Sequence, residues 1–219
     1  MIRRSMMALA IVGLAAVAST SSAQIGRRSS GASQPGYWVG LSLGYVDGTS
    51  MSDDNTGAVW RFGYTSQIRA TLEKALSAGS SIGISAGFST APLSYTAGSV
   101  LSSDCFATCD AKADITQVLA FFRGNTGGDV GLKFFYQAEG GVTEFGNFRD
   151  RSTDAKLPPS SASNDFTFGF GGGIGYGLSP IADLYVGEMW DIVLHHQSSA
   201  ESQSAPRLST LRAGFRIGF

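Results

Sequence analysis

Eight segments of this chain alternate apolar residues with polar or small ones, and this period of two restricts the fold more than any other feature. Such a period places successive side chains on opposite faces of a β-strand. In the final segment, LSTLRAGFRIGF, one face carries Leu211, Ala213, Phe215, Ile217 and Phe219. The eight predicted strands cover 36–46, 60–73, 80–89, 113–123, 130–145, 165–178, 183–194 and 208–219.

The connections between these strands alternate between long and short. Long polar connections follow the odd-numbered strands, at 47–58, 90–112, 146–164 and 195–206. Short connections follow the second, fourth and sixth strands, at 74–79, 124–129 and 179–182. In an antiparallel meander, this rhythm places every long loop at one end, here named the loop end, and every short turn at the other, the turn end.

The phase of the fourth strand is open. Ile115, Leu119 and Phe121 align as its apolar face, but Gln117 shares that face. A bulge or a shifted phase would each explain this break in the alternation.

The first 23 residues have the pattern of a secretory signal. The positively charged start is Arg3 and Arg4, and it precedes a short apolar core at 6–17. The small residues 21–23 then precede a cleavage site before Gln24. About twelve apolar residues are fewer than the roughly 20 that a membrane-spanning helix needs. We therefore expect export with a cleaved signal peptide (1–23), a flexible leader (24–35) and one folded domain (36–219).

Eight alternating strands can close into a barrel, and the character of the polar face indicates which side is outside. That face is rich in glycine and serine, which suit a narrow lumen better than a solvent-facing strand. The apolar face ends in aromatic residues: Tyr37, Tyr176 and Phe219 near the turn end, and Tyr45, Trp60 and Phe166 near the loop end. The pattern predicts an all-β, eight-stranded antiparallel up-and-down transmembrane barrel rather than a soluble barrel or sandwich.

The alternation that ends in Phe219 resembles the C-terminal strand of bacterial outer-membrane proteins, which the barrel-assembly machinery recognises. Residues 36–219 resemble the small OmpA/OmpX-type barrels, often grouped as porin-family proteins. The resemblance implies a location in the outer membrane of a Gram-negative bacterium and contact with lipid and lipopolysaccharide. It also implies assembly by that machinery through Leu211, Ala213, Phe215, Ile217 and Phe219. It is unspecific for activity, and we expect a monomer.

Charged residues on the inward face predict a network inside the lumen. Counted from the turn end, Glu139 and Arg212 fall at similar heights, as do Lys133 and Arg216. Glu188 shares the phase of apolar neighbours, yet it could reach these arginines if it faced inward. The predicted lumenal network is Lys133, Glu139, Glu188, Arg212 and Arg216, with Arg61 or Arg69. A lumen of eight strands is filled by side chains, so we interpret this network as a structural plug.

Two other functions stay open from the sequence. The charge network could gate a narrow ion channel. His196 and Ser198 resemble the His-x-Ser pair of the PagL-type lipid A deacylases, which are also eight-stranded barrels. Ser199 stands where that family has asparagine, and the last strand lacks the glutamate that orients the histidine, so we expect no enzymatic activity.

The loops are the remaining candidates for binding. Cys105 and Cys109 lie four residues apart in an exported chain, which predicts a disulfide that closes a small loop. Exposed loops on a rigid scaffold often carry binding, so a surface ligand is possible without a residue pattern that selects it. The 16 basic and 17 acidic residues nearly balance, which argues against nucleic acid as a partner. We expect no cofactor and no metal.

Overall fold

The computed structural model describes residues 35–53, 57–96, 108–157, 163–194 and 206–219. These residues form strands joined by turns, and no helix among them is long and apolar enough to cross a membrane. The strands are β1 Tyr37–Val46, β2 Ser50–Asp53, β3 Ala58–Phe62, β4 Thr65–Ser77, β5 Ser80–Thr96, β6 Thr108–Thr126, β7 Gly131–Asp150, β8 Ser163–Ser179, β9 Ala182–Leu194 and β10 Arg207–Gly218.

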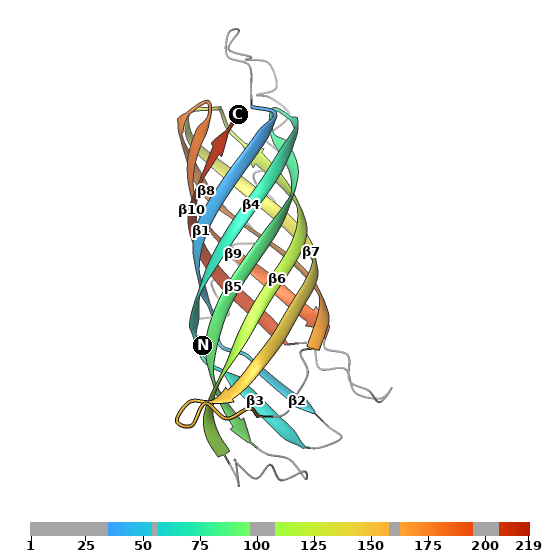
Figure 1. Cartoon of the computed structure of the whole chain (residues 1–219). Coiled ribbons are helices and arrows are strands. Elements are labelled where there is room, and N and C mark those ends of the chain that lie inside the picture. Colours follow the sequence, from blue (N-terminus) through green and yellow to red (C-terminus); the bar gives the residue numbers. More distant parts are fainter. Residues whose placement is uncertain (1–34, 54–56, 97–107, 158–162, 195–205) are drawn as a thin grey trace, which may run out of the picture. The chain divides into compact units, whose positions relative to one another are not determined.

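Eight of the strands close into one antiparallel barrel, in the ring order β1, β4, β5, β6, β7, β8, β9 and β10 (Figure 1). The pairing of β10 with β1 and of β5 with β6 gives each of the eight two neighbours. Closure satisfies the backbone hydrogen bonds that an open sheet leaves unpaired at its edges. The predicted fold class, an eight-stranded antiparallel up-and-down barrel, is therefore confirmed.

The seam between β1 and β10 extends to the last residue of the chain. The carbonyl oxygen of Phe219 accepts hydrogen bonds of 3.1 Å from the backbone N–H groups of Gly36 and Tyr37. The N–H of Phe219 donates to the carbonyl of Tyr37 at 2.9 Å, and the two rings stack with centroids 6.1 Å apart. The terminal residue thus completes the ladder instead of fraying, which explains why the alternation persists to the end.

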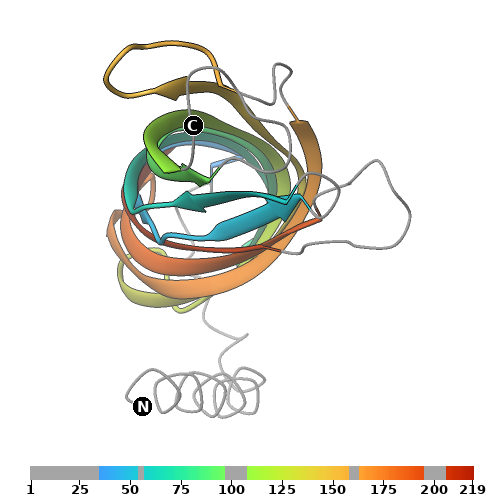
Figure 2. The same cartoon turned by 90° about the horizontal axis from the view of Figure 1, so that it is seen from below.

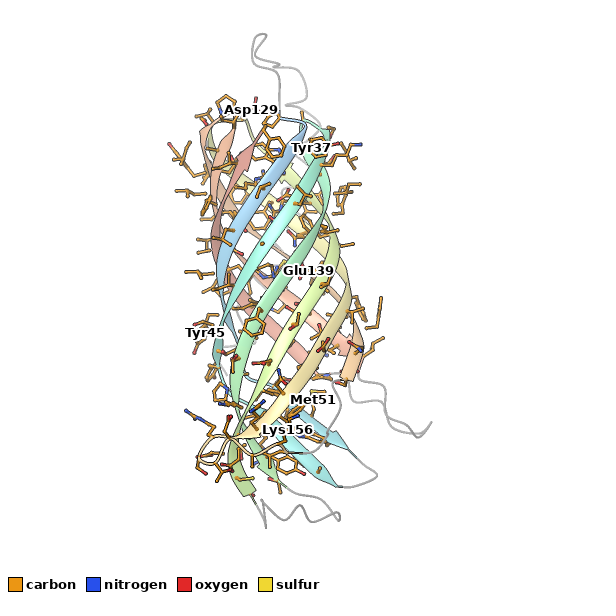
Figure 3. The ribbon with its side chains drawn as sticks, viewed as in Figure 1. Tyr37, Tyr45, Met51, Asp129, Glu139 and Lys156 are labelled. Atoms are coloured by element: carbon orange, nitrogen blue, oxygen red, sulfur yellow. The ribbon has the colours of Figure 1, made fainter. Side chains whose placement is uncertain are left out.

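The two faces of the barrel wall differ as the alternation predicts. On β1, Leu43 is 65% exposed and the neighbouring Ser42 is 3% exposed. Side chains project outward along the wall from Tyr37 at the turn end to Tyr45 nearer the loop end (Figure 3). The five apolar residues predicted as an assembly signal all lie on this outer face: Leu211, Ala213, Phe215, Ile217 and Phe219. An apolar exterior surrounds a polar interior.

The structure settles the phase of the fourth strand, which the sequence left open. On β6, Leu119 is fully buried inside the barrel and Val118 is 58% exposed on the outer wall. Ile115 and Phe121 also face inward, together with Gln117. Gln117 marked the inward phase correctly, because it hydrogen-bonds within the lumen. The apolar residues of β6 face inward because part of this lumen is packed with apolar side chains.

A short hairpin stands where the first long loop was expected. β2 pairs with β3, and β3 pairs with the distal end of β5, from Leu93 to Thr96. Viewed from the loop end, this hairpin lies across the opening of the barrel (Figure 2). The predicted strand 60–73 is therefore divided: its first residues belong to the hairpin, and the barrel wall resumes at Thr65. Trp60 faces Tyr95 and Phe148 rather than joining an outer aromatic girdle.

The second and third loops are shorter than predicted because the strands continue beyond the apolar wall. β5 and β6 stay paired up to Thr96 and Thr108, within the expected loop 90–112. β7 continues to Asp150, within the expected loop 146–164. The loop end thus carries an ordered extension of the barrel on which side chains are held in fixed positions.

Candidate functional site

The interior of the barrel is the first candidate site, and glycines on β8 provide its space. Gly169 and Gly173 face the lumen, where neighbouring strands contribute large side chains. A methyl group on Gly169 would overlap Oδ1 of Asp191, and one on Gly173 would lie 2.9 Å from Cε1 of Phe135. The bare β8 wall therefore lets charged and aromatic groups from β7 and β9 fill the centre of the barrel.

A first group of charges, the turn-end cluster, consists of Glu73, Arg123, Lys133, Asp183 and Arg216. Glu73 accepts hydrogen bonds from Arg123 at 2.8 Å and from Arg216 at 3.0 Å. Asp183 accepts hydrogen bonds from Lys133 at 2.7 Å and from Nε of Arg216 at 2.8 Å. All five residues are buried. Arg216 thus links the two carboxylates, and charge-assisted hydrogen bonds tie together five strands of the wall.

The guanidinium groups of this cluster also pack on aromatic rings. Arg123 lies 5.2 Å from the centroid of Phe135 and 5.1 Å from that of Tyr185. Arg216 lies 4.5 Å from the ring of Trp38. Rings on several sides restrict the rotation of the guanidinium groups and add cation–π attraction. The arrangement is a rigid packing of charges with little freedom to move aside.

A second group, the central cluster, consists of Arg69, Glu139, Asp191 and Arg212. Glu139, near mid-height of the barrel in Figure 3, pairs with Arg212 at 2.9 Å and with Arg69 at 3.8 Å. Asp191 lies 3.7 Å from Arg212 and is fully buried. Arg69 also donates to Ser85 at 3.0 Å. Two basic and two acidic groups therefore balance one another in the middle of the lumen.

Five residues of the predicted network lie in the lumen: Lys133, Glu139, Arg212, Arg216 and, of the two alternatives, Arg69. The predictions for Arg61 and Glu188 were wrong. Arg61 is exposed on β3, which belongs to the loop-end hairpin and not to the barrel wall. Glu188 pairs in register with Leu211, which is 54% exposed on the outer face. The outward phase of Leu184 and Val186 governs β9, so Glu188 faces outward with them.

Four charged residues of the lumen were not predicted: Glu73, Arg123, Asp183 and Asp191. A signal for the two aspartates was present, because they alternate with Leu184 and Val186 on β9 and so share the inward phase. Arg123 was not predicted because the phase of β6 was open from the sequence. Opposite partners across the barrel could not be inferred, since they depend on the heights of strands far apart in sequence.

An apolar core fills the barrel towards the loop end. The hydroxyls of Thr143 and Thr167, 2.7 Å apart, mark the end of the polar lumen. Closer to the loop end, the rings of Phe62 and Phe145 lie 5.5 Å apart, and this contact joins the hairpin to the barrel interior. This loop-end core consists of Val46, Met51, Ala58, Phe62, Ala91, Leu93, Tyr95, Ala111, Ala113, Ile115, Phe145, Phe148, Leu157, Val193 and Leu208.

The space left between the side chains of the lumen is small. A cavity bounded by Ser42, Phe135, Tyr185 and Arg212 measures about 10 Å³, and another at the turn-end mouth, beside Asp129, measures about 50 Å³. About 10–15 Å³ of such space holds a single water molecule. The interior therefore acts as a packed plug, which is polar towards the turn end and apolar towards the loop end.

An ordered turn on the extension is the second candidate site. Oδ1 of Asp150 accepts hydrogen bonds from the Ser152 hydroxyl at 2.5 Å, the Ser152 N–H at 2.8 Å and the Thr153 N–H at 2.9 Å. These bonds, above all the one from the Ser152 hydroxyl, lower the pKa of Asp150 to about 2. The following Asp154 accepts a hydrogen bond from Arg149 at 2.8 Å. The turn is thus held by a carboxylate that must be ionised.

Acid should loosen this turn. Because the folded pKa of Asp150 is about 2 and its ordinary value is 3.8, the carboxylate stabilises the turn above about pH 4. That contribution is lost as the pH falls through about 2. We expect the amide chemical shifts of Ser152 and Thr153 to titrate with a midpoint near pH 2. Ser152→Ala should raise the midpoint and Asp150→Asn should abolish it; a wild-type midpoint near 4 would contradict the hydrogen bonding.

Several predicted residues fall outside the described residues. Cys105, His196 and Ser198 are among them, so the disulfide and the deacylase alternative stay predictions. Cys109 lies at the start of β6. Residues 1–23, the predicted signal peptide, also lie outside this part of the chain.

No family model and no curated protein matches the chain. Among solved structures, Neisserial surface protein A has 14% sequence identity and a TM-score of 0.54, with 86% of this chain and 100% of that chain covered. OprG of Pseudomonas aeruginosa has 12% sequence identity and a TM-score of 0.48, with 85% of this chain and 97% of that chain covered. AlkL has 15% sequence identity and a TM-score of 0.49, with 88% of this chain and 94% of that chain covered. With its closed ring of eight antiparallel strands, the chain has the fold of the small bacterial outer-membrane barrels.

Proposed function

We propose that the protein is a non-enzymatic integral barrel of the bacterial outer membrane, with a structural or surface-interaction role carried by its loop end. The observation that carries this proposal is the combination of an apolar exterior with a sealed interior. On this view the chain is exported with its signal peptide removed, and its partners are outer-membrane lipid, lipopolysaccharide and a surface ligand at the loop end.

The exterior supports a place in lipid. Large apolar side chains stand exposed around the whole ring, for example Leu43 on β1, Val118 on β6 and Phe170 on β8. A water-soluble protein rarely exposes so continuous an apolar surface. A closed sheet is also the one arrangement of strands that satisfies backbone polar groups within hydrocarbon.

The interior supports a role that does not involve solute passage. A solute entering at the turn end would have to break the ion pairs of Glu73 and Glu139, which are buried and directly bonded to guanidinium groups. It would then meet the loop-end core, where Phe62 and Met51 of the hairpin close the barrel. Displacing both layers would expose unpaired charges and apolar side chains at once, which is strongly unfavourable.

The loop end supports a role in contact with other molecules. The β2–β3 hairpin and the extensions of β5, β6 and β7 project beyond the apolar wall at the loop end (Figure 1). They rest on the loop-end core, so they form a rigid platform for the residues that connect them. Binding residues are often found on loops that such scaffolds hold in place.

Reconstitution tests this function directly. We expect the purified barrel to migrate on gels differently before and after boiling, and to remain electrically silent in planar lipid bilayers. In intact cells, external protease should cleave within 97–107 or 158–162 and leave the barrel wall whole. Stable conductance steps that Glu139→Ala alters would contradict the sealed lumen, whereas recovery of the protein in the soluble fraction would contradict its place in the membrane.

A further inference from the structure

Glu188 is an acidic residue on the outer face of the barrel wall, where Lys74 of β4 and Arg207 of β10 also face outward. Glu188 faces outward on β9, in register with Leu211 on one side and Gly172 on the other. The outward neighbours along its own strand are Val186 and Trp190. The carboxyl group therefore lies on the surface that the proposed function assigns to lipid.

The depth of Glu188 is close to the middle of that wall. β9 runs from Ala182 to Leu194, so Glu188 is its central residue, six positions from either end. Six residues of a strand tilted by about 40° rise roughly 15 Å, and the apolar band of such barrels is about 25 Å tall. Charged groups at this depth are rare and usually have a functional role, because ionisation there requires a partner.

The partners of Glu188 differ from those of the lumenal acids. Within the described part of the chain, its polar partner is the hydroxyl of Ser209, which donates at 2.8 Å. Glu73 and Glu139, by contrast, each contact two guanidinium groups. A single hydroxyl does not neutralise a carboxylate in a medium of low dielectric constant.

The surroundings of the carboxyl group favour a cation with an apolar chain. Gly172 contributes no side chain to the outer face beside Glu188, so the outer surface has a shallow depression at that position. The rings of Phe170 and Trp190 lie next to it with centroids 5.6 Å apart. A carboxylate beside aromatic rings attracts an ammonium group, and the apolar wall accommodates the attached chain.

We propose that Glu188 binds the ammonium group of a lipid-soluble amine at the outer face of β8, β9 and β10. This inference rests on the proposed place of the wall in lipid. A second copy of the chain fits less well, because a two-fold interface through this patch would bring a second Glu188 to the first. The ligand class is therefore an alkylammonium, with its charge at Glu188 and its chain along the barrel.

Dodecylammonium is the probe that tests this site, with dodecanol as the uncharged probe of equal length. With the barrel in nanodiscs of zwitterionic lipid, we expect dodecylammonium to shift the amide signals of Gly172 and Leu211 saturably. It should do so at concentrations about tenfold below those needed with dodecanol. Glu188→Gln should remove this difference. Glu144→Gln, which changes an exposed acid farther towards the loop end, should preserve it.

Two outcomes would overturn the inference. Equal shifts with both probes, unchanged in Glu188→Gln, would mean that Glu188 does not bind the ammonium group and keeps Ser209 as its partner. A dimer that dissociates in Glu188→Gln would mean that a second copy occupies the patch. Contacts between Leu211 and lipid acyl chains, measured in the same samples, test the proposed function separately. If those contacts are seen and the probes do not differ, only the ammonium site fails.

Discussion

Replacing Glu73 with alanine is expected to destabilise the barrel by about 3–5 kcal/mol, the usual effect of removing one partner from a buried ion pair. Glu73 is the acceptor for both Arg123 and Arg216, so its loss leaves two buried guanidinium groups short of a carboxylate. Of the two carboxylates of the turn-end cluster, only Asp183 would remain, in contact with Lys133 and Arg216. Urea unfolding in lipid vesicles, followed by tryptophan fluorescence, measures the change.

Glu144→Ala is the matched control for this substitution, because it removes an exposed glutamate from β7. It should change the free energy of unfolding by less than about 0.5 kcal/mol. Glu73→Gln, which keeps an acceptor oxygen but not the charge, should fall between the two. If Glu73→Ala unfolded at the same urea concentration as the wild type, the turn-end cluster would not hold the wall together.

The second large effect is expected at Gly173. A methyl group there would lie 2.5 Å from Cα of Gly187 and 2.9 Å from the ring of Phe135, and it would overlap the carbonyl of Val186. Backbone atoms of a paired strand cannot move aside as the end of a flexible side chain can. We expect Gly173→Ala to cost about 3 kcal/mol or more, at the upper end for an overpacked interior. A lower yield of heat-modifiable barrel should accompany the lower stability.

Gly140→Ala provides the comparison for Gly173→Ala. A methyl group on Gly140 would find its nearest neighbour, the carbonyl of Thr167, at an ordinary 3.7 Å. This substitution should leave both folding yield and stability close to wild type. Equal losses in the two variants would indicate a general need for glycine in these strands. The close approach inside the barrel would then not be the cause.

The wall of the barrel could be predicted from the sequence because outward-facing and lumen-facing positions alternate along most strands. The signal is clear on β1, where Leu43 and Ser42 differ in exposure as expected. It fails on β6, where Leu119 is as apolar as any outer residue yet lies inside. The alternation separates two faces, but it does not say which face is outside once the lumen contains an apolar core.

The contacts inside the lumen could be predicted only in part from the sequence, for a different reason. Glu139 and Arg212 were matched by counting residues from the turns, and this works when both strands are regular. Glu73 and Arg216 belong to β4 and β10, the two strands that flank β1, and they lie 143 positions apart in sequence. Such contacts depend on the tilt and stagger of all eight strands, which no single strand encodes. The hairpin that closes the loop end was likewise hidden, since the short β2 is polar and part of β3 was predicted as the start of the next barrel strand.

The bond between Phe219 and the first rung of β1 has a consequence for the order of events during biogenesis. Positions 38–46 find their partners in 210–218, far along the chain. This ladder can therefore form only after residues 210–218 have been synthesised, and the chain must be kept from aggregating until then. The pairing of β10 with β1 converts an open sheet with two unpaired edges into a closed cylinder.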